Sequence, residues 1–294
     1  FGLCDILKEG VNFDTPSWAV NEIYEHTHDT AFVREMYPKL LKYHKWWYAK
    51  RDHDKNHICE FGSVDGTLVA AAWESGMDNA IRFDGTKMLQ NGPDAWSTDQ
   101  ESVDLNAYLS LEYTLLKRFA ALLDEPFLLP DYRSMVADYF FDKKDGFFYD
   151  RRMNATRDFV REAGCEGYIP FWANIATKEQ FAKARKLLDN KKKFSTYIPF
   201  PTIAADNPKY DPKGYWRGPI WLDQTYYGIK GYRNYGEGKK ADAYTDQVFR
   251  NIEGLTEGAP IYENYDTHTG KPMQASHFSW SAACLLMLYN DYGK

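Results

Sequence analysis

Helical segments separated by unusually long loops are the feature that most constrains this chain of 294 residues. Apolar residues recur at helical spacing in about eight segments. These predicted helices cover residues 17–29, 31–51, 101–124, 129–143, 177–189, 221–235, 238–254 and 277–291. The loops between them include residues 52–98, 144–176 and 190–220, and loops of this length are uncommon unless they are functional. Because a long loop follows each helix pair, the pattern predicts an all-α toroid of one domain, with one set of loops on a single face.

The ends of several predicted helices carry their own signals. Ser17 is a suitable N-cap for the first helix, and Thr177 with Gln180 has the pattern of a capping box. Pro38 lies inside the second segment. That stretch is therefore expected to be either two helices or one kinked helix.

The charge balance of the chain limits its expected partners. The 36 Lys and Arg residues against 42 Asp and Glu give a net charge of −6, which argues against a nucleic-acid partner because phosphates require a basic face. No apolar run approaches the roughly 20 residues that span a bilayer, so no membrane partner is expected. Aromatic residues make up 17% of the chain. They suit hydroxyl-rich ligands such as sugars, although a large aromatic core would give the same count.

The cysteines and the first residues give little functional information. The four cysteines are far apart and lack the spacing of metal ligands, so isolated, buried thiols are expected at Cys4, Cys59, Cys165 and Cys284. No basic segment followed by an apolar segment is visible at the start, so no signal peptide is identified. No organic cofactor is predicted, and the oligomeric state is left open.

The first candidate site lies in residues 71–80. Glu74 and Asp78 are four residues apart, a spacing that would place both on one helix face. Gly76 between them favours a loop instead. Taken alone, an acidic pair in a loop is more often solvated than catalytic.

The second candidate site lies in residues 258–271. Glu263 and Asp266 stand among Tyr262 and Tyr265 in a segment with few apolar anchors. The tyrosine rings are able to shield a carboxylate from water and raise its pKa, as acid/base catalysis requires. The alternative is a surface turn with a charged rim.

The third candidate site lies in residues 214–224, between the two acidic segments. Trp216 and Trp221 flank an Arg-Gly-Pro turn that leads into a predicted helix. The planar fork of Arg217 is suited to a carboxylate or a sugar hydroxyl, and the tryptophans offer ring faces to a pyranose. The alternative is helix packing, which is more easily accepted for one of these tryptophans than for both.

The fourth candidate site lies in residues 51–62 and resembles the first part of a calcium loop. Asp52, Asp54 and Asn56 alternate along the chain and are followed by the Ile58 carbonyl and Glu60. Two departures stand out. The usual glycine of the sixth position is replaced by a histidine, which tolerates positive φ, and no glutamate occupies the twelfth. A remote carboxylate such as that of Glu101 would have to complete the shell, and an ordinary polar turn is the alternative.

Several of these segments together resemble glycoside hydrolase family 63, which includes processing α-glucosidase I and bacterial α-glucosidases. The resemblance rests on WESGMDN at 73–79, YWRGPIW at 215–221 and YENYD at 262–266. Supporting segments are YHKWW at 43–47, SVDLN at 102–106 and HFSW at 277–280. The motifs occur in the family's order from about residue 17 to the C-terminus.

For the fold, the resemblance implies an (α/α)6 toroid of the six-hairpin type. The predicted helices are fewer than those of a complete toroid, and the family's upstream β-sandwich is absent. The chain, residues 1–294, is therefore expected to be the C-terminal two-thirds of a catalytic domain. The bacterial members are often exported, so a periplasmic or secreted location is suspected.

For the chemistry, the resemblance implies an inverting exo-α-glucosidase that acts on small oligosaccharides. Asp78 matches the general acid and Glu263 the general base, and Arg217 is a hypothetical partner that keeps Glu263 ionised. In an inverting enzyme these two carboxyl groups would lie about 6.5–9.5 Å apart. The expected substrate-binding residues are Trp73, Trp216, Arg217, Trp221, Tyr262 and Trp280. The expected Ca²⁺ ligands, as in the bacterial members, are Asp52, Asp54, Asn56, Ile58 and Glu101.

Two other functions compete with this hypothesis. A trehalase shares the toroid and a related acid/base pair, but Met77 and Asn79 around Asp78 favour the α-glucosidase group. A non-catalytic sugar-binding module would need an aromatic cleft but no acid/base pair. A structural helical repeat is disfavoured because no period of about 30–50 residues is visible.

Overall fold

The computed structural model describes residues 15–294, which divide into two compact units. Unit 1 comprises, among the described residues, 15–78, 85–140 and 150–159, and unit 2 comprises 79–84, 141–149 and 160–294. Each unit is described by itself. The described residues form ten α-helices, and none of these is both long enough and apolar enough to cross a membrane. The single toroidal domain spanning 1–294 remains a prediction.

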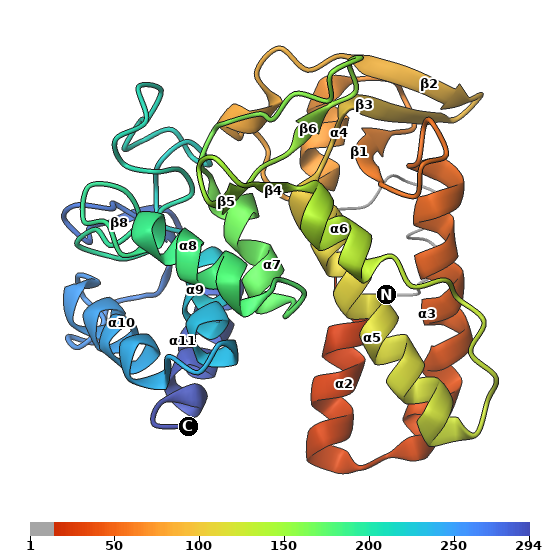
Figure 1. The fold of residues 1–294 in the computed structure, drawn as a ribbon. Coiled ribbons are helices and arrows are strands. Elements are labelled where there is room, and N and C mark those ends of the chain that lie inside the picture. Colours follow the sequence, from red (N-terminus) through yellow and green to blue (C-terminus); the bar gives the residue numbers. More distant parts are fainter. Residues whose placement is uncertain (1–14) are drawn as a thin grey trace. The chain divides into compact units, whose positions relative to one another are not determined.

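Three long helices form the core of unit 1 and contact one another pairwise (Figure 1). They are α2 (Pro16–Thr27), α3 (Thr30–Lys50) and α5 (Val103–Leu123). Their apolar positions recur every three or four residues, so each presents one stripe to the others. Val33, Leu40, Leu116 and Phe119 are completely buried in this cluster. A shorter helix, α6 (Arg133–Tyr139), packs against α5.

The helix ends confirm some sequence expectations and correct others. The capping box of Thr177 and Gln180 is present. The first helix, however, has Thr15 at its N-cap position, and Ser17 instead donates from Oγ to Glu112 Oε1 at 2.9 Å. The segment around Pro38 is one helix rather than two. The helix predicted for residues 129–143 is also shorter, because the chain after α6 enters strand β4 (Phe141–Asp142).

A small sheet in unit 1 adds strands to the helix-rich fold, which the all-α prediction does not include. Its strands β1 (Glu60–Ser63), β3 (Ala95–Glu101) and β2 (Met88–Gly92) are antiparallel in that order, and β6 (Arg151–Arg152) also pairs with β3. Helix α4 (Leu68–Glu74) packs on β1. The sheet thus fills the predicted loop 52–98 and joins it to residues 151–152.

Unit 2 is built around helix α9, which contacts α7, α10 and α11. The helices of this unit are α7 (Ile169–Trp172), α8 (Lys178–Leu188), α9 (Leu222–Asn234), α10 (Gly238–Asn251) and α11 (Ser279–Asp291). Single 3₁₀ turns occur at Ile81–Phe83 and Cys165–Tyr168. Two antiparallel hairpins complete it, β4 (Phe141–Asp142) with β5 (Phe147–Phe148) and β7 (Tyr262–Tyr265) with β8 (Pro272–Ser276).

Three cysteines are buried free thiols, as expected from their isolation: Cys59, Cys165 and Cys284. The fourth, Cys4, lies outside the described residues. The structure therefore tests the cysteine expectation at three positions of four and agrees with it at those three.

Candidate active site

Glu263 stands on strand β7 of unit 2 and is half-buried. The Tyr215 hydroxyl donates to its Oε1 at 2.6 Å, and the Ala275 N–H donates to its Oε2 at 3.3 Å. The register of the hairpin shifts between Tyr262 and Asn264, and Gln274 on the partner strand has φ of 63°. Such irregularities re-aim side chains. The carboxylate is therefore held in one orientation while part of it remains accessible.

The segment that carries Tyr215 is fixed by its aromatic neighbours. Trp216 and Trp221 stack at 4.0 Å between ring centroids and 13° between planes, and each is only 2% exposed. Trp221 Nε1 donates to the Tyr215 carbonyl at 3.0 Å. Because the two indoles cover each other, the packing alternative is favoured for both. Their expected contact with a sugar remains a prediction.

Arg217 does not pair with Glu263, which corrects that hypothesis. Its guanidinium binds Asp84 through two hydrogen bonds of 2.9 and 3.0 Å and donates to the Asn79 carbonyl at 3.2 Å. The hydrogen bond from Arg217 lowers the pKa of Asp84. Both charges are thus satisfied within unit 2, and the donor to Glu263 is the neutral hydroxyl of Tyr215.

Asn79, the residue after Asp78, is hydrogen-bonded to the segment of unit 2 that carries Tyr215. Asn79 Nδ2 donates to the Gly214 carbonyl at 3.0 Å, and the Trp216 N–H donates to Asn79 Oδ1 at 3.0 Å. The Asn79 side chain therefore binds the backbone on both sides of Tyr215, at Gly214 and at Trp216. Asn79 was identified from sequence only as part of a motif, and its role as an anchor depends on contacts that span about 135 residues.

Asp78 itself belongs to unit 1 and follows helix α4, in the loop that Gly76 predicts. Gly76 has φ of 75°, and Asp78 is half-buried. Trp73 on the last turn of α4 is 54% exposed, as a substrate-binding ring requires. The separation of Asp78 and Glu263, which belong to different units, remains a prediction.

The other acid of the first candidate pair has a structural role. Glu74 is 2% exposed and forms three hydrogen bonds of 2.6 to 3.1 Å with the Arg51 guanidinium. Its Oε2 also accepts the Gly62 N–H at 2.6 Å. Glu74 therefore joins α3, β1 and α4, and the spacing of Glu74 and Asp78 does not create a catalytic pair.

Two further rings expected at the substrate are accessible in unit 2. Trp280 is 44% exposed and lies 5.7 Å from the Trp221 ring. Tyr262 is half-buried beside Glu263 on the same strand. Both rings therefore have accessible surface in this unit, and their contact with a sugar remains a prediction.

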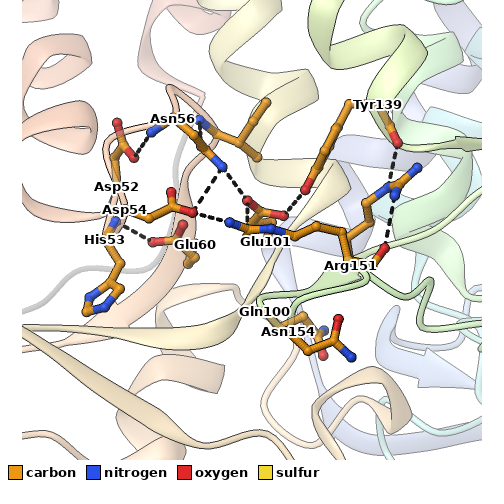
Figure 2. A network of polar contacts seen from close by, with 12 residues as sticks. Asp52, His53, Asp54, Asn56, Glu60, Gln100, Glu101, Tyr139, Arg151 and Asn154 are labelled. Carbon is orange, nitrogen blue, oxygen red and sulfur yellow. Dashed lines mark hydrogen bonds and ion pairs between the residues drawn. The ribbon is translucent and has the colours of Figure 1, made fainter.

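The loop that follows α3 in unit 1 places Asp52, Asp54 and Asn56 in one network of polar contacts with Glu60 and Glu101 (Figure 2). Asp52 accepts the Asn56 N–H at 3.1 Å on one carboxylate oxygen and the His57 N–H at 3.2 Å on the other. His57 has φ of 70°, the left-handed conformation required at the sixth position of a calcium loop. Carboxylate oxygens of three residues approach within 4.8 Å of one another: Asp52, Asp54 and Glu60.

Glu60 is the carboxylate of this cluster that has a buried oxygen without a hydrogen-bond partner among the described residues. It is completely buried; its Oε2 accepts the His53 N–H at 3.0 Å, and its Oε1 has no hydrogen-bond partner among the described residues. Burial, with a smaller contribution from Glu101 and Asp52, raises the pKa of Glu60 well above its usual value. An unpartnered buried oxygen beside other carboxylates fits a hard cation.

Glu101, the remote carboxylate expected to complete the shell, is already bound by protein donors (Figure 2). Its Oε1 accepts from Asn56 Nδ2 at 2.7 Å and from Arg157 Nη1 at 3.0 Å, and its Oε2 accepts the Tyr139 hydroxyl. Arg157 also forms an ion pair with Asp54. One guanidinium therefore neutralises part of the acidic cluster.

Sequence reasoning missed two further residues of unit 2. Tyr215 was read as part of a motif, but it supplies the hydrogen bond to Glu263. Asp223, in the first turn of α9, is buried, and burial raises its pKa to about 6. The sequence signal for Asp223 is its position at the start of a predicted helix, two residues after Trp221.

Comparison with known proteins gives a consistent family match. A family model described as the mannosylglycerate hydrolase MGH1-like glycoside hydrolase domain matches residues 12–281. Mannosylglycerate hydrolase MGH1 of Selaginella moellendorffii is 27% identical over 88% of this chain and 61% of the relative. Mannosyl-oligosaccharide glucosidase of Saccharomyces cerevisiae is 25% identical over 88% of this chain and 35% of the relative. The chain thus spans less than two thirds of either relative.

A solved structure shows the same fold. The GH63 mannosylglycerate hydrolase of Thermus thermophilus, in complex with glucose, superposes with a TM-score of 0.77 at 21% identity. The match covers 96% of this chain and 76% of the other. The fold is therefore the helix-rich, toroid-type fold of these glycosidases.

Proposed function

The chain belongs to the family of MGH1-like glycoside hydrolase domains, and on this premise we propose that it hydrolyses an α-glycosidic bond with inversion. The sequence-based assignment to glycoside hydrolase family 63 is confirmed. In this proposal the fold is an (α/α)6 toroid of the six-hairpin type. Asp78 is the general acid and Glu263 is the general base.

The observation that carries the proposal is the double anchoring of residues 214–216. On one side Tyr215 donates its hydroxyl to Glu263 at 2.6 Å. On the other side the backbone of Gly214 and Trp216 binds Asn79, the residue that directly follows Asp78. A single short segment therefore orients the proposed base and fixes the chain next to the proposed acid.

The reaction assigns a separate task to each carboxyl group. Asp78 donates a proton to the leaving glycosidic oxygen. Glu263 accepts a proton from a water molecule that attacks the anomeric carbon from the opposite face. The Tyr215 hydroxyl and the Ala275 N–H donate to different oxygens of Glu263, so each oxygen keeps a lone pair that can take that proton. Trp73, Trp280 and Tyr262 supply ring faces for the sugar.

The substrate we propose is a small α-glycoside. Accessible aromatic rings suit a sugar of one or two units, and α-glucosides follow from the motifs around Asp78. An α-mannosyl or α-glucosyl glycerate is the second candidate because a relative is named a mannosylglycerate hydrolase. The two candidates differ in the aglycone, which is a neutral sugar in one case and an acid in the other.

We further propose that the loop of residues 52–60 holds a structural Ca²⁺ ion. The fit rests on the unpartnered Oε1 of Glu60, the clustered oxygens of Asp52 and Asp54, and the left-handed His57. The Ile58 carbonyl and the Asn56 side chain remain proposed ligands, whereas Glu101 is committed to Arg157 and Tyr139. A bound ion would supply positive charge to buried carboxylates and would take no part in the reaction.

A hydrolysis screen tests the proposed activity. The panel contains nigerose, kojibiose, trehalose, mannosylglycerate and glucosylglycerate, and the free sugar released is measured for the wild type, Asp78→Asn and Glu263→Gln. We expect at least one compound other than trehalose to be hydrolysed, with activity lost in both variants. Preferred turnover of trehalose would identify a trehalase. Sugar binding without hydrolysis of any compound would identify a binding module, and wild-type activity in both variants would refute the assigned pair.

A further inference from the structure

A pocket in unit 1 is built from residues that the proposed reaction does not use. It has a volume of about 280 Å³, opens to solvent and is lined by the end of α3, the loop after it and the segment before α6. None of Trp73, Asp78 or Glu101 lines it. Its size lies just below the usual range for drug-sized ligands, which indicates a smaller occupant.

The wall of this pocket carries a surplus of positive charge. Two lysines, Lys45 and Lys55, line it against a single carboxylate. The one carboxylate on the wall, Asp52, is 2% exposed, and its two oxygens accept backbone N–H groups of the loop. The ammonium group of Lys45 is paired with none of the described residues, so it is available to a ligand.

His44 makes the pocket a built site rather than a patch of surface lysines. The ring is 3% exposed, and its Nδ1 lies 2.9 Å from Glu112 Oε2. The other oxygen of Glu112 accepts the Ser17 hydroxyl at 2.9 Å. These contacts fix the imidazole. Because Nδ1 donates to the Glu112 carboxylate, Nε2 of the neutral ring is left as a hydrogen-bond acceptor.

The remaining walls suit the carbon body of a ligand. Tyr48 lies against His44 with ring centroids 5.3 Å apart, and Tyr132 stacks on His57 at 4.6 Å and 10°. Leu129 is a further apolar wall. Burial raises the pKa of both tyrosine hydroxyls. They therefore remain neutral donors that do not repel an anion.

We propose that this pocket binds a small organic anion, with its carboxylate or phosphate group on Lys45 and Lys55, a hydroxyl group on His44 Nε2 and its carbon body on the tyrosines. Positive charge, a buried oriented imidazole and apolar walls meet in one cavity, and this combination is selective for an anion with a compact body. A neutral sugar would leave the lysine charges unpaired.

Calorimetric titration of the whole protein tests the proposal. The probes are glucuronate for a carboxylate, glucose 6-phosphate for a phosphate and glucose as the neutral control, all in EDTA so that no bound cation holds the anion. The test variant is Lys45→Glu. The matched control is Lys42→Glu, an exposed lysine on the same helix that does not line the pocket.

We expect at least one anion to bind with a dissociation constant of about 1 mM or tighter. Lys45→Glu should weaken this binding about tenfold or more, because a charge-assisted contact is lost and a repulsion is added. Lys42→Glu should leave it nearly unchanged, and any glucose binding should be equal in the two variants. Binding of neither anion, or equal anion binding in both variants, would overturn the proposal.

Discussion

Glu60 and Glu263 both stand on short antiparallel strands that follow a polar loop, yet their surroundings are opposite. Glu60 is completely buried near Asp52 and Asp54, and one of its oxygens has no hydrogen-bond partner among the described residues. Glu263 is half-buried, and each of its oxygens accepts one hydrogen bond from a neutral donor. Burial penalises an unpaired carboxylate severely, whereas partial exposure with fixed donors keeps it usable.

This contrast agrees with the roles that we propose, structural for Glu60 and catalytic for Glu263. Around Glu60 the chain concentrates carboxyl groups, whose charge a proton or a cation relieves, and Arg157 neutralises part of it through Asp54 and Glu101. Around Glu263 the hydrogen bonds from Tyr215 and Ala275 fix the orientation of the carboxylate. We therefore expect changes near Glu60 to alter stability and changes near Glu263 to alter turnover.

Replacement of Glu263 by Gln should have the largest effect. The amide keeps the shape of the side chain but cannot accept the proton of the attacking water, so kcat should fall about thousandfold or more. The melting temperature should stay close to that of the wild type because the group is half-exposed. Steady-state kinetics with thermal unfolding measures both. Glu257→Gln, an exposed acid between α10 and β7, is the matched control and should retain full activity.

Asp223 shows what burial alone does to a carboxyl group without acidic neighbours. Burial raises its pKa to about 6 from the usual 3.8, so folding favours the protonated form. The contribution of this group to stability is complete below about pH 4 and is lost as the pH rises through about 6. Asp223→Asn does not ionise, so its stability relative to the wild type should increase by about 2 kcal/mol between about pH 4 and pH 7.

Urea denaturation of both proteins across this pH range measures the difference directly. Parallel stability curves would show that the Asp223 carboxyl is not penalised by its surroundings.

Arg157→Gln should weaken the cation loop. Without the guanidinium, Asp54 and Glu101 lose their ion pairs, and the free energy of unfolding should fall by about 2 kcal/mol in EDTA. Millimolar Ca²⁺ should recover most of this loss if the loop binds the ion. Arg133→Gln, which breaks a more exposed pair with Asp131, should cost at most about 1 kcal/mol. An equal loss in EDTA and in Ca²⁺ would contradict the proposed ion.

Tyr215→Phe should have the smallest effect. The ring and its packing remain, but the 2.6 Å hydrogen bond to Glu263 is lost. We expect kcat to fall about tenfold, the value of one hydrogen bond to a charged group, with little change in KM. Tyr292→Phe, near the C-terminus and exposed, is the control. Unchanged kcat in Tyr215→Phe would mean that the backbone of the hairpin alone orients the base.

Much of the helical architecture follows from local sequence signals. The segment predicted at 221–235 forms a helix at Leu222–Asn234, and the segment at 177–189 forms one at Lys178–Leu188 with its capping box. Periodicity and capping are properties of neighbouring residues, so they are visible in one sequence. Strand β3 was missed because its sequence is polar and its pairing partners are distant.

The partners of the site residues were less predictable than the residues themselves. Arg217 was expected at Glu263, but it binds Asp84, which is 133 positions away. Glu101 was expected to face a cation, but Arg157, 56 positions later, occupies it. These hydrogen-bond partners depend on which side chains the fold brings together. They cannot be predicted from a local sequence pattern.

The central claim, an inverting attack directed by Glu263, is tested most directly by proton NMR of the first-formed sugar. The best substrate of the screen is hydrolysed by the wild-type protein, and the anomeric signals are followed before mutarotation equalises them. Our account predicts that an α-glycoside releases the β-anomer first. Release of the α-anomer first would show retention and would contradict the assignment of Glu263 as a general base.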